Sequence, residues 1–207
     1  MSRLLAFGCS YTWGAGLPDT FNALKKYKSG NKPSEFAWPT LLANKLGLDY
    51  LNLSQPGSGN KEILYKVINQ TFLENDLVIL YWSHFVRFDF FRASKEGGFR
   101  AQRNDLYFKT FIKSTDIITE DWKYDNAMQN YLAIKFVQMF LDQKKIKHYS
   151  LFTLPDFYTY DIPSYIDLNT TLKIKHNTFI TDMSPDGMHF GVKSQENLAE
   201  ELYNRIK

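Results

Sequence analysis

The stretch LLAFGCSYTWG, residues 4–14, combines a short apolar run with a serine at the start of a glycine-flanked turn. Leu4–Phe7 contains no polar residue, which is typical of a strand in a parallel sheet that is buried on both faces. Ser10 therefore lies where such a strand ends and the chain turns towards solvent. This position suits a nucleophile, because a strand tip is rigid and its side chain is open to a substrate.

The sequence SPDGMHFG, Ser184–Gly191, supplies an acid and a base near the other end of the chain. Asp186 lies three positions before His189, so its carboxylate can reach one ring nitrogen and fix the tautomer of the imidazole. With Ser10, these residues form a possible nucleophilic triad in the chain order Ser, Asp, His. Each also has a structural alternative: Ser10 as a helix N-cap, Asp186 as a turn residue and His189 as a structural histidine.

The rest of the chain alternates between apolar runs and amphipathic segments. We expect strands at Leu4–Phe7, Asp49–Leu53, Leu77–Trp82 and Tyr149–Leu154, and helices at Phe36–Leu46, Asn60–Phe72, Asp125–Lys145 and Gln195–Ile206. This alternation predicts an α/β fold, a three-layer α/β/α sandwich with a parallel sheet of the flavodoxin-like type. Residues 92–123 and 155–184 interrupt it and are too short for separate domains. We therefore expect one domain, residues 1–207, with these two stretches as insertions over one edge of the sheet.

The helix expected at Asp125–Lys145 has the clearest period. Met128, Leu132, Phe136 and Phe140 follow one another at steps of four residues, which predicts that they face the core. In the helix expected at Asn60–Phe72, Asn60 is a candidate cap.

Composition excludes several classes of function. The 207 residues suffice for one domain with a substantial core, and the net charge of +3 does not favour nucleic acid as a partner. No stretch approaches the ~20 apolar residues of a membrane span, and no signal-peptide pattern is present. We therefore expect no membrane partner and a cytoplasmic location. The single cysteine, Cys9, excludes an internal disulfide, and no residues have metal-ligand spacing, so no cofactor is expected.

Four segments of the chain line up with the sequence blocks of the SGNH/GDSL hydrolases, and the resemblance covers essentially the whole chain. FGCSYT resembles the first block, with Cys9 in place of the usual Asp, and implies that Ser10 is the nucleophile. SPDGMHFG resembles the last block and implies that Asp186 is the acid and His189 the base. Small members of this family with a Gly-Cys-Ser first block and a Trp-containing third block often look phage-encoded, so the resemblance implies a possible viral source.

The second block is also recognisable, but the third departs from the family. NLSQPGSGN, Asn52–Asn60, resembles the second block, and the match implies an oxyanion role for the N–H groups of Gly57 and Ser10. The third block usually reads Gly-x-Asn-Asp, whereas this chain reads YWSHF at residues 81–85. Ser83 or His84 could replace the missing Asn as a hydrogen-bond donor. Loss of one oxyanion donor typically costs about 10²–10³ in rate, so the activity could be low, specialised or absent.

The resemblance implies a serine ester hydrolase that acts through an acyl-enzyme on a small-molecule or glycan ester. Tyr11, Trp13 and Trp82 are candidate substrate-binding residues, because an aromatic wall suits a sugar ring or an acyl chain; the alternative is that they are core aromatics. A short acyl group on a carbohydrate is the favoured substrate. A different class also remains open, a non-catalytic protein that keeps the fold and binds a glycan. The changed third block favours this alternative, whereas the complete triad favours the enzyme.

Overall fold

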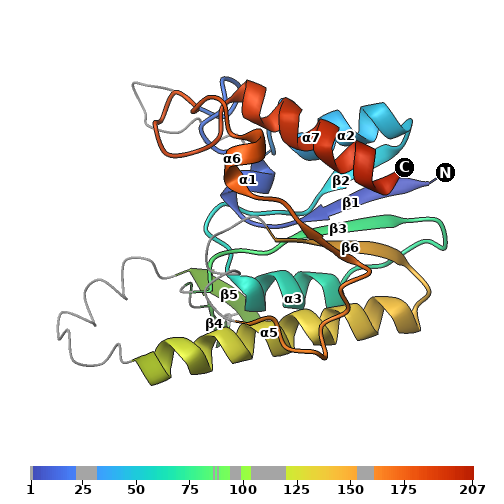
Figure 1. Ribbon diagram of the computed structural model, residues 1–207, viewed down its shortest axis with the longest axis vertical. Coiled ribbons are helices and arrows are strands. Elements are labelled where there is room, and N and C mark those ends of the chain that lie inside the picture. Colours follow the sequence, from blue (N-terminus) through green and yellow to red (C-terminus); the bar gives the residue numbers. More distant parts are fainter. Residues whose placement is uncertain are drawn as a thin grey trace.

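The computed structural model describes residues 2–21, 32–85, 87, 89–93, 99–103, 120–152 and 161–207. Its centre is a five-stranded sheet in the order β2-β1-β3-β6-β7, in which every neighbouring pair is parallel (Figure 1). The strands are β1 (Arg3–Phe7), β2 (Asp49–Asn52), β3 (Leu77–Tyr81), β6 (Lys147–Phe152) and β7 (Thr171–Lys173). This order reverses between β1 and β3, as in flavodoxin-like folds. The predicted α/β class with a parallel sheet is confirmed.

Helices cover both faces of the sheet (Figure 1). One face carries α1 (Ser10–Trp13), α2 (Trp38–Leu46) and α7 (Val192–Ile206), and the short α6 (His176–Phe179) lies on the same side. The other face carries α3 (Asn60–Ile68) and α5 (Glu120–Gln143). The strands β4 (Asp89–Ala93) and β5 (Phe99–Arg103) pair antiparallel in a separate two-stranded sheet. In the described part of the chain, no helix is both long and apolar enough to cross a membrane.

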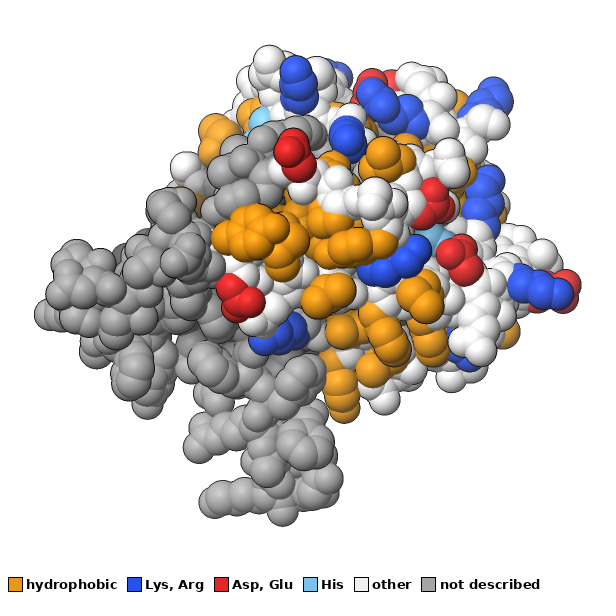
Figure 2. Space-filling model, turned by 60° about the horizontal axis from the view of Figure 1, so that its bottom comes forward, with side chains coloured by type: hydrophobic (Ala, Val, Ile, Leu, Met, Phe, Trp, Pro, Cys, Tyr) orange, Lys and Arg blue, Asp and Glu red, His pale blue; other side chains and the backbone are white. Residues whose placement is uncertain are grey.

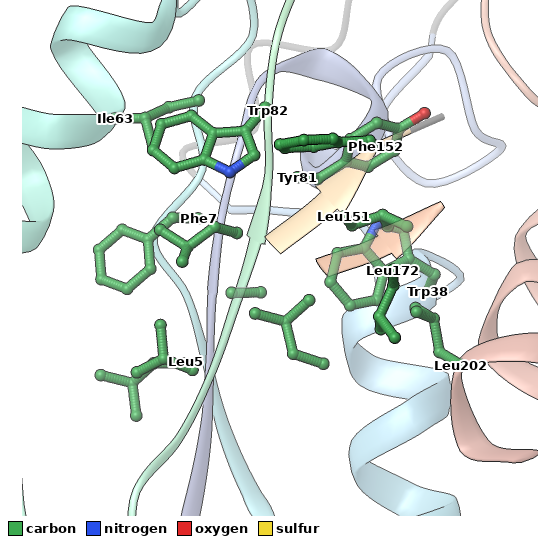
Figure 3. Packing of buried hydrophobic residues seen from close by; sticks show 14 of the residues in the cluster. Leu5, Phe7, Trp38, Ile63, Tyr81, Trp82, Leu151, Phe152, Leu172 and Leu202 are labelled. Atoms are coloured by element: carbon green, nitrogen blue, oxygen red, sulfur yellow. The ribbon is translucent and has the colours of Figure 1, made fainter. Parts of the chain in front are cut away.

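Apolar side chains fill the space between the sheet and both helical layers (Figure 3). Phe7, Trp82 and Ile63 pack on the side of α3, whereas Trp38 and Leu202 pack on the side of α2 and α7. All five have no exposed surface. Each such side chain contributes about 1.5–3 kcal/mol of hydrophobic stabilisation. Packing against both faces of the sheet therefore stabilises the positions of the strands.

The helix α5 exists as predicted, but it buries a different face. Of the four residues expected in the core, Met128 and Phe140 are partly buried and pack against it, but Leu132 and Phe136 are 58% and 53% exposed. Ile134 and Val137 are fully buried instead. A four-residue step overshoots one full turn by about 40°, so residues at repeated four-residue steps drift away from a fixed direction. The buried residues alternate steps of three and four instead. Leu132, Phe136 and Met139 of α5 are all exposed, and Figure 2 shows hydrophobic side chains gathered on this side of the molecule.

Three further expectations need correction. The stretch 155–184 contributes a strand, β7, rather than only an insertion; three residues are too few to give an apolar run that reveals a strand. The helix α3 ends at Ile68 instead of Phe72, and its N-cap is Gly59. Asn60 is therefore not the cap. Residues 94–98 and 104–119 of the first expected insertion and 155–160 of the second, together with the predicted strand end at 153–154, lie outside the described residues.

Candidate active site

Three of the four motif segments meet at the carboxyl edge of the sheet. Ser10 follows β1, the loop 53–59 follows β2 and the turn 82–85 follows β3. In open α/β sheets, ligands bind outside the carboxyl ends of the strands at the point where the strand order reverses. Here that point lies between β1 and β3, and Ser10 follows β1 after two residues.

Ser10 is the first residue of α1. The N-cap position belongs to Cys9, so the alternative that Ser10 is the cap does not hold. The Ser10 side chain is 5% exposed, and among the described residues its hydroxyl has no hydrogen-bond partner. Its N–H lies at the positive end of the helix and donates to no described carbonyl. Ser10 therefore combines a hydroxyl and an N–H that have no described partner, but it is buried rather than open to solvent as the sequence predicted.

Side chains from β2 and α7 hold α1 in place. Asn52 Nδ2 donates a 2.7 Å hydrogen bond to the Thr12 carbonyl, and Gln195 Nε2 donates a 3.3 Å bond to the Tyr11 carbonyl. At Gly8, a Cβ atom would lie 2.2 Å from Thr12 Oγ1, so a side chain there would push α1 away from β1. Neither Asn52 nor Gln195 was singled out in the sequence, because no local pattern marks an amide that acts on a distant carbonyl.

Asp186 and His189 form a close pair. Asp186 Oδ2 lies 2.6 Å from His189 Nδ1, while Asp186 Oδ1 accepts hydrogen bonds from Ser184 Oγ at 2.6 Å and from the Met188 N–H at 2.8 Å. Burial raises the pKa of Asp186, but the hydrogen bonds from Ser184, Met188 and His189 outweigh it, so this pKa lies below its ordinary value. An ionised carboxylate only accepts. His189 Nδ1 therefore carries the proton, and Nε2 of the neutral ring is left as an acceptor.

The first and last blocks lie against each other. The Tyr11 ring meets the edge of the His189 ring at a centroid distance of 5.5 Å and stacks on Phe190 at 4.4 Å. On the other side, a Cβ atom at Gly16 would lie 2.4 Å from Asp186 Oδ2. The chain that follows α1 therefore packs directly on the carboxylate, and Tyr11, next to Ser10, packs on the imidazole.

The second block is bound to the end of β1. The Gln55 N–H donates a 3.2 Å hydrogen bond to the Gly8 carbonyl, which holds the loop beside the start of α1. Gly57 follows in the left-handed region, with φ +82°, a conformation that favours glycine. Its N–H donates to no described residue. This N–H and that of Ser10 are thus both available to an oxygen atom at this edge.

The third block is tied to the second by one side chain. Asn60 Oδ1 accepts a 2.7 Å hydrogen bond from the Ser83 N–H, and Asn60 Nδ2 donates a 3.0 Å bond to the Ser83 carbonyl. The Ser83 hydroxyl is buried and has no hydrogen-bond partner among the described residues. His84 is half-buried. The pKa of His176 lies below its ordinary value, because burial lowers it and the charge of His84 lowers it further.

The predicted aromatic wall is only partly present. Tyr11 and Trp13 are half-buried and retain exposed surface. Trp82 has none, because it packs between the sheet and α3 (Figure 3), so it is a core residue without surface for a substrate. An aromatic residue beside a motif does not reveal in which direction its side chain points. Across the described segments, no three His, Cys, Asp or Glu residues are placed to hold a metal ion.

Sequence comparison finds no relative: no family model matches the chain, and no curated protein matches it. Solved structures do match in fold. A protein named for the G-D-S-L family of lipolytic proteins, from Desulfitobacterium hafniense DCB-2, superposes with a TM-score of 0.56 at 11% identity, over 98% of both chains.

Two carbohydrate esterases match over 99% of this chain. The acetyl xylan esterase Est2A of the rumen bacterium Butyrivibrio proteoclasticus has a TM-score of 0.57 at 15% identity. A second carbohydrate esterase, described as having an active site with divergent catalytic and non-catalytic binding functions, has a TM-score of 0.59 at 14% identity. The chain spans less than two thirds of the length of these two proteins, 63% and 64%. At such identities the likeness establishes the fold alone: the expected three-layer α/β/α fold is confirmed, and it is similar to that of a lipolytic protein and of esterases.

Proposed function

We propose that this protein is a serine ester hydrolase of the SGNH/GDSL type, which cleaves a carboxylic ester through an acyl-enzyme. The observation that carries the proposal is the 2.6 Å contact between Asp186 and His189, beside the block that contains Ser10. An imidazole whose Nδ1 proton is held by a carboxylate has a free Nε2, which is the arrangement that a general base requires. The fold shared with lipolytic proteins and esterases supports the same chemistry.

In the proposed reaction, Ser10 Oγ attacks the ester carbonyl carbon and His189 Nε2 takes its proton. The tetrahedral intermediate collapses as the C–O bond to the alcohol breaks, and His189 returns the proton to the departing alkoxide. Water then attacks the acyl-enzyme with the same proton transfers, which releases the acid and restores Ser10. Asp186 keeps the imidazole oriented and stabilises its charged form.

The negative oxygen of each intermediate needs donors that are already in place. We assign this role to the N–H groups of Ser10 and Gly57, which have no described acceptor. The family's Asn is missing from the third block, and we assign its role to Ser83 or His84. The buried Ser83 hydroxyl without a partner supports the first candidate. The half-buried position of His84 supports the second.

A short acyl group on a carbohydrate is the proposed substrate. Tyr11 and Trp13 offer half-buried aromatic surface for a sugar ring, and an acetyl xylan esterase is among the proteins of similar fold. The test is hydrolysis of 4-nitrophenyl acetate and of acetylated xylo-oligosaccharides. Ser10→Ala should remove nearly all turnover, while Cys9→Ala, a change at the adjacent buried residue, should retain it. Equal turnover by wild type and Ser10→Ala would refute the proposal.

A second candidate, a protein that binds glycans without cleaving them, is favoured by the changed third block. The carbohydrate esterase described with non-catalytic binding functions supports it as an option for this fold. Titration of candidate oligosaccharides against Ser10→Ala separates the two candidates. Binding without any Ser10-dependent turnover of their acetylated forms would favour the second.

A further inference from the structure

Arg87 lies between the second and third blocks, although no motif includes it. Its N–H donates a 3.1 Å hydrogen bond to the His84 carbonyl, which closes the turn after β3. Its guanidinium Nη1 donates a 3.2 Å bond to the Ser58 carbonyl. Ser58 directly follows Gly57, whose N–H we assign to the oxyanion hole. The guanidinium is therefore held at the edge of the proposed catalytic site.

The charge of Arg87 also reaches the first block. Burial raises the pKa of the Tyr11 phenol, with Cys9 and Asp186 adding to the rise, while Arg87 opposes them. Tyr11 follows Ser10 and touches the His189 ring. The hydrogen bond to Ser58 thus places the cation beside the second block, and the opposing effect of Arg87 on the Tyr11 pKa agrees with that placement.

No protein carboxylate within the described segments neutralises this cation. Arg3 pairs with Asp76 and Arg205 pairs with Glu201, but Arg87 forms no ion pair with a described acid. The raised pKa keeps the Tyr11 phenol neutral at physiological pH. One nitrogen of the Arg87 guanidinium donates to a carbonyl oxygen. A guanidinium has five N–H donors in a planar fork that matches a carboxylate or a phosphate, so donors remain for such a group. The half-buried side chain leaves surface for such a group.

We propose that Arg87 binds an anionic group, a carboxylate or a phosphate, on the ester that this site cleaves. The inference rests on the proposed function and narrows it to a substrate class, esters that are negatively charged near the scissile bond. Charge-assisted hydrogen bonds to such a group are shorter and stronger than neutral ones. A neutral acetylated sugar would leave this interaction unused.

The test compares kcat/KM for matched pairs of esters. On the acyl side the pair is 4-nitrophenyl succinate and its neutral methyl ester. On the alcohol side, 4-acetoxybenzoate and 4-acetoxyphenyl phosphate are each compared with neutral 4-acetoxybenzamide. We expect the wild type to favour at least one anionic ester, and Arg87→Gln to lower that anionic-to-neutral ratio by about 10- to 100-fold. Because each ratio is compared between variants, the intrinsic reactivity of the esters cancels.

Two further variants separate substrate binding from a structural role. Arg87→Lys should keep part of the ratio, since it retains the charge but not the fork. The matched control, Arg205→Gln, removes a surface arginine on α7 and should keep the ratio unchanged. If Arg87 only ties the two loops together, Arg87→Gln will lower both members of a pair equally. An unchanged ratio in that variant, or no anionic preference in the wild type, would overturn the proposal.

A binding measurement keeps this inference separate from the proposed function. The amides 4-acetamidobenzoate and 4-acetamidobenzamide imitate one ester pair but resist cleavage, so their affinities can be measured by calorimetry without turnover. Tighter binding of the benzoate that is lost in Arg87→Gln supports the inference, even if no ester is cleaved in a Ser10-dependent way. Equal affinity for both amides overturns it, even if Ser10-dependent cleavage of neutral esters is observed.

Discussion

The carboxylate of Asp186 is held between the imidazole of His189, 2.6 Å from Nδ1, and the backbone at Gly16. The first contact orients the imidazole that we propose as the base, and the second restricts the carboxylate from the opposite side. Ser184 Oγ and the backbone N–H groups of Met188 and His189 also donate to Asp186. The orientation of His189 therefore depends on the contacts that hold the Asp186 carboxylate in place, which come from Gly16, Ser184 and Met188.

Replacement of that carboxylate tests its role directly. Asp186→Asn keeps the size of the side chain but can present an N–H₂ group to Nδ1, which favours the wrong tautomer of His189. We expect kcat to fall by about 10³–10⁴-fold with the circular dichroism spectrum unchanged. If kcat for 4-nitrophenyl acetate stays near the wild-type value, Asp186 is only a turn residue.

Gly16→Ala tests whether the packing behind the carboxylate matters. An added Cβ would lie 2.4 Å from Asp186 Oδ2 and 2.5 Å from Ser184 Oγ, so Asp186 must move. We expect a fall in kcat of at least about tenfold, through misorientation of His189. The matched control is Gly47→Ala, at a similar positive φ, +67° against +83°, but with no atom within 4 Å of the added Cβ. The control should lose about 1 kcal/mol of stability and no activity. Equal loss of activity in both variants would show that backbone strain, not the carboxylate, is responsible.

Features that a few neighbouring residues determine were predictable from the sequence, whereas features that depend on tertiary structure were not. Ser10 and the Asp186–His189 pair were predictable because a strand end and a three-residue spacing are local features. The strand β7 was not, since three residues carry too little pattern. Nor was the outward direction of Leu132, because α5 carries apolar residues on two faces and only packing decides between them. Arg87 belongs to no motif, and its place beside the second block arises from tertiary structure alone.

The two candidates for the third oxyanion donor differ in their expected effect on stability. The Ser83 hydroxyl is buried without a described partner, so Ser83→Ala should leave the free energy of unfolding unchanged or raise it. If Ser83 is the donor, this variant should nevertheless lose about 10²-fold in kcat. If His84 is the donor, the loss should appear in His84→Ala instead. Should neither variant lower kcat by more than about threefold, the N–H groups of Ser10 and Gly57 act alone.

The orientation of α5 predicts unequal costs for two similar truncations. Ile134 is fully buried, so Ile134→Ala should lower the free energy of unfolding by about 2–5 kcal/mol. Leu132, two residues earlier in the same helix, is 58% exposed, and Leu132→Ala should cost less than about 1 kcal/mol. Urea denaturation measures both values. A larger cost at Leu132 would mean that this face is covered by other parts of the molecule.

Acid should weaken the attachment of α7, because Asp182 accepts hydrogen bonds at the start of that helix. Its carboxylate receives 2.7 Å and 3.1 Å bonds from the Ser194 and Lys193 N–H groups. Burial raises the pKa of Asp182, but the bonds from Ser194 and Lys193 outweigh it, and the pKa lies below its ordinary value. The folded state therefore binds protons less readily than the unfolded state. The stabilisation is complete above the ordinary value and is lost as the pH falls through the window below it.

Asp182→Asn tests this linkage, since it removes the charge and leaves one oxygen acceptor. At pH 7 we expect the variant to be less stable than the wild type by about 1 kcal/mol, the usual worth of a helix-capping side chain. Below about pH 4, the unfolded-state pKa of Asp, the wild type loses this advantage and the two stabilities should converge. Urea denaturation at pH 7, 4 and 3 measures the difference. A gap that stays constant over this range would mean that Asp182 stabilises α7 through its shape and hydrogen bonds rather than through its charge.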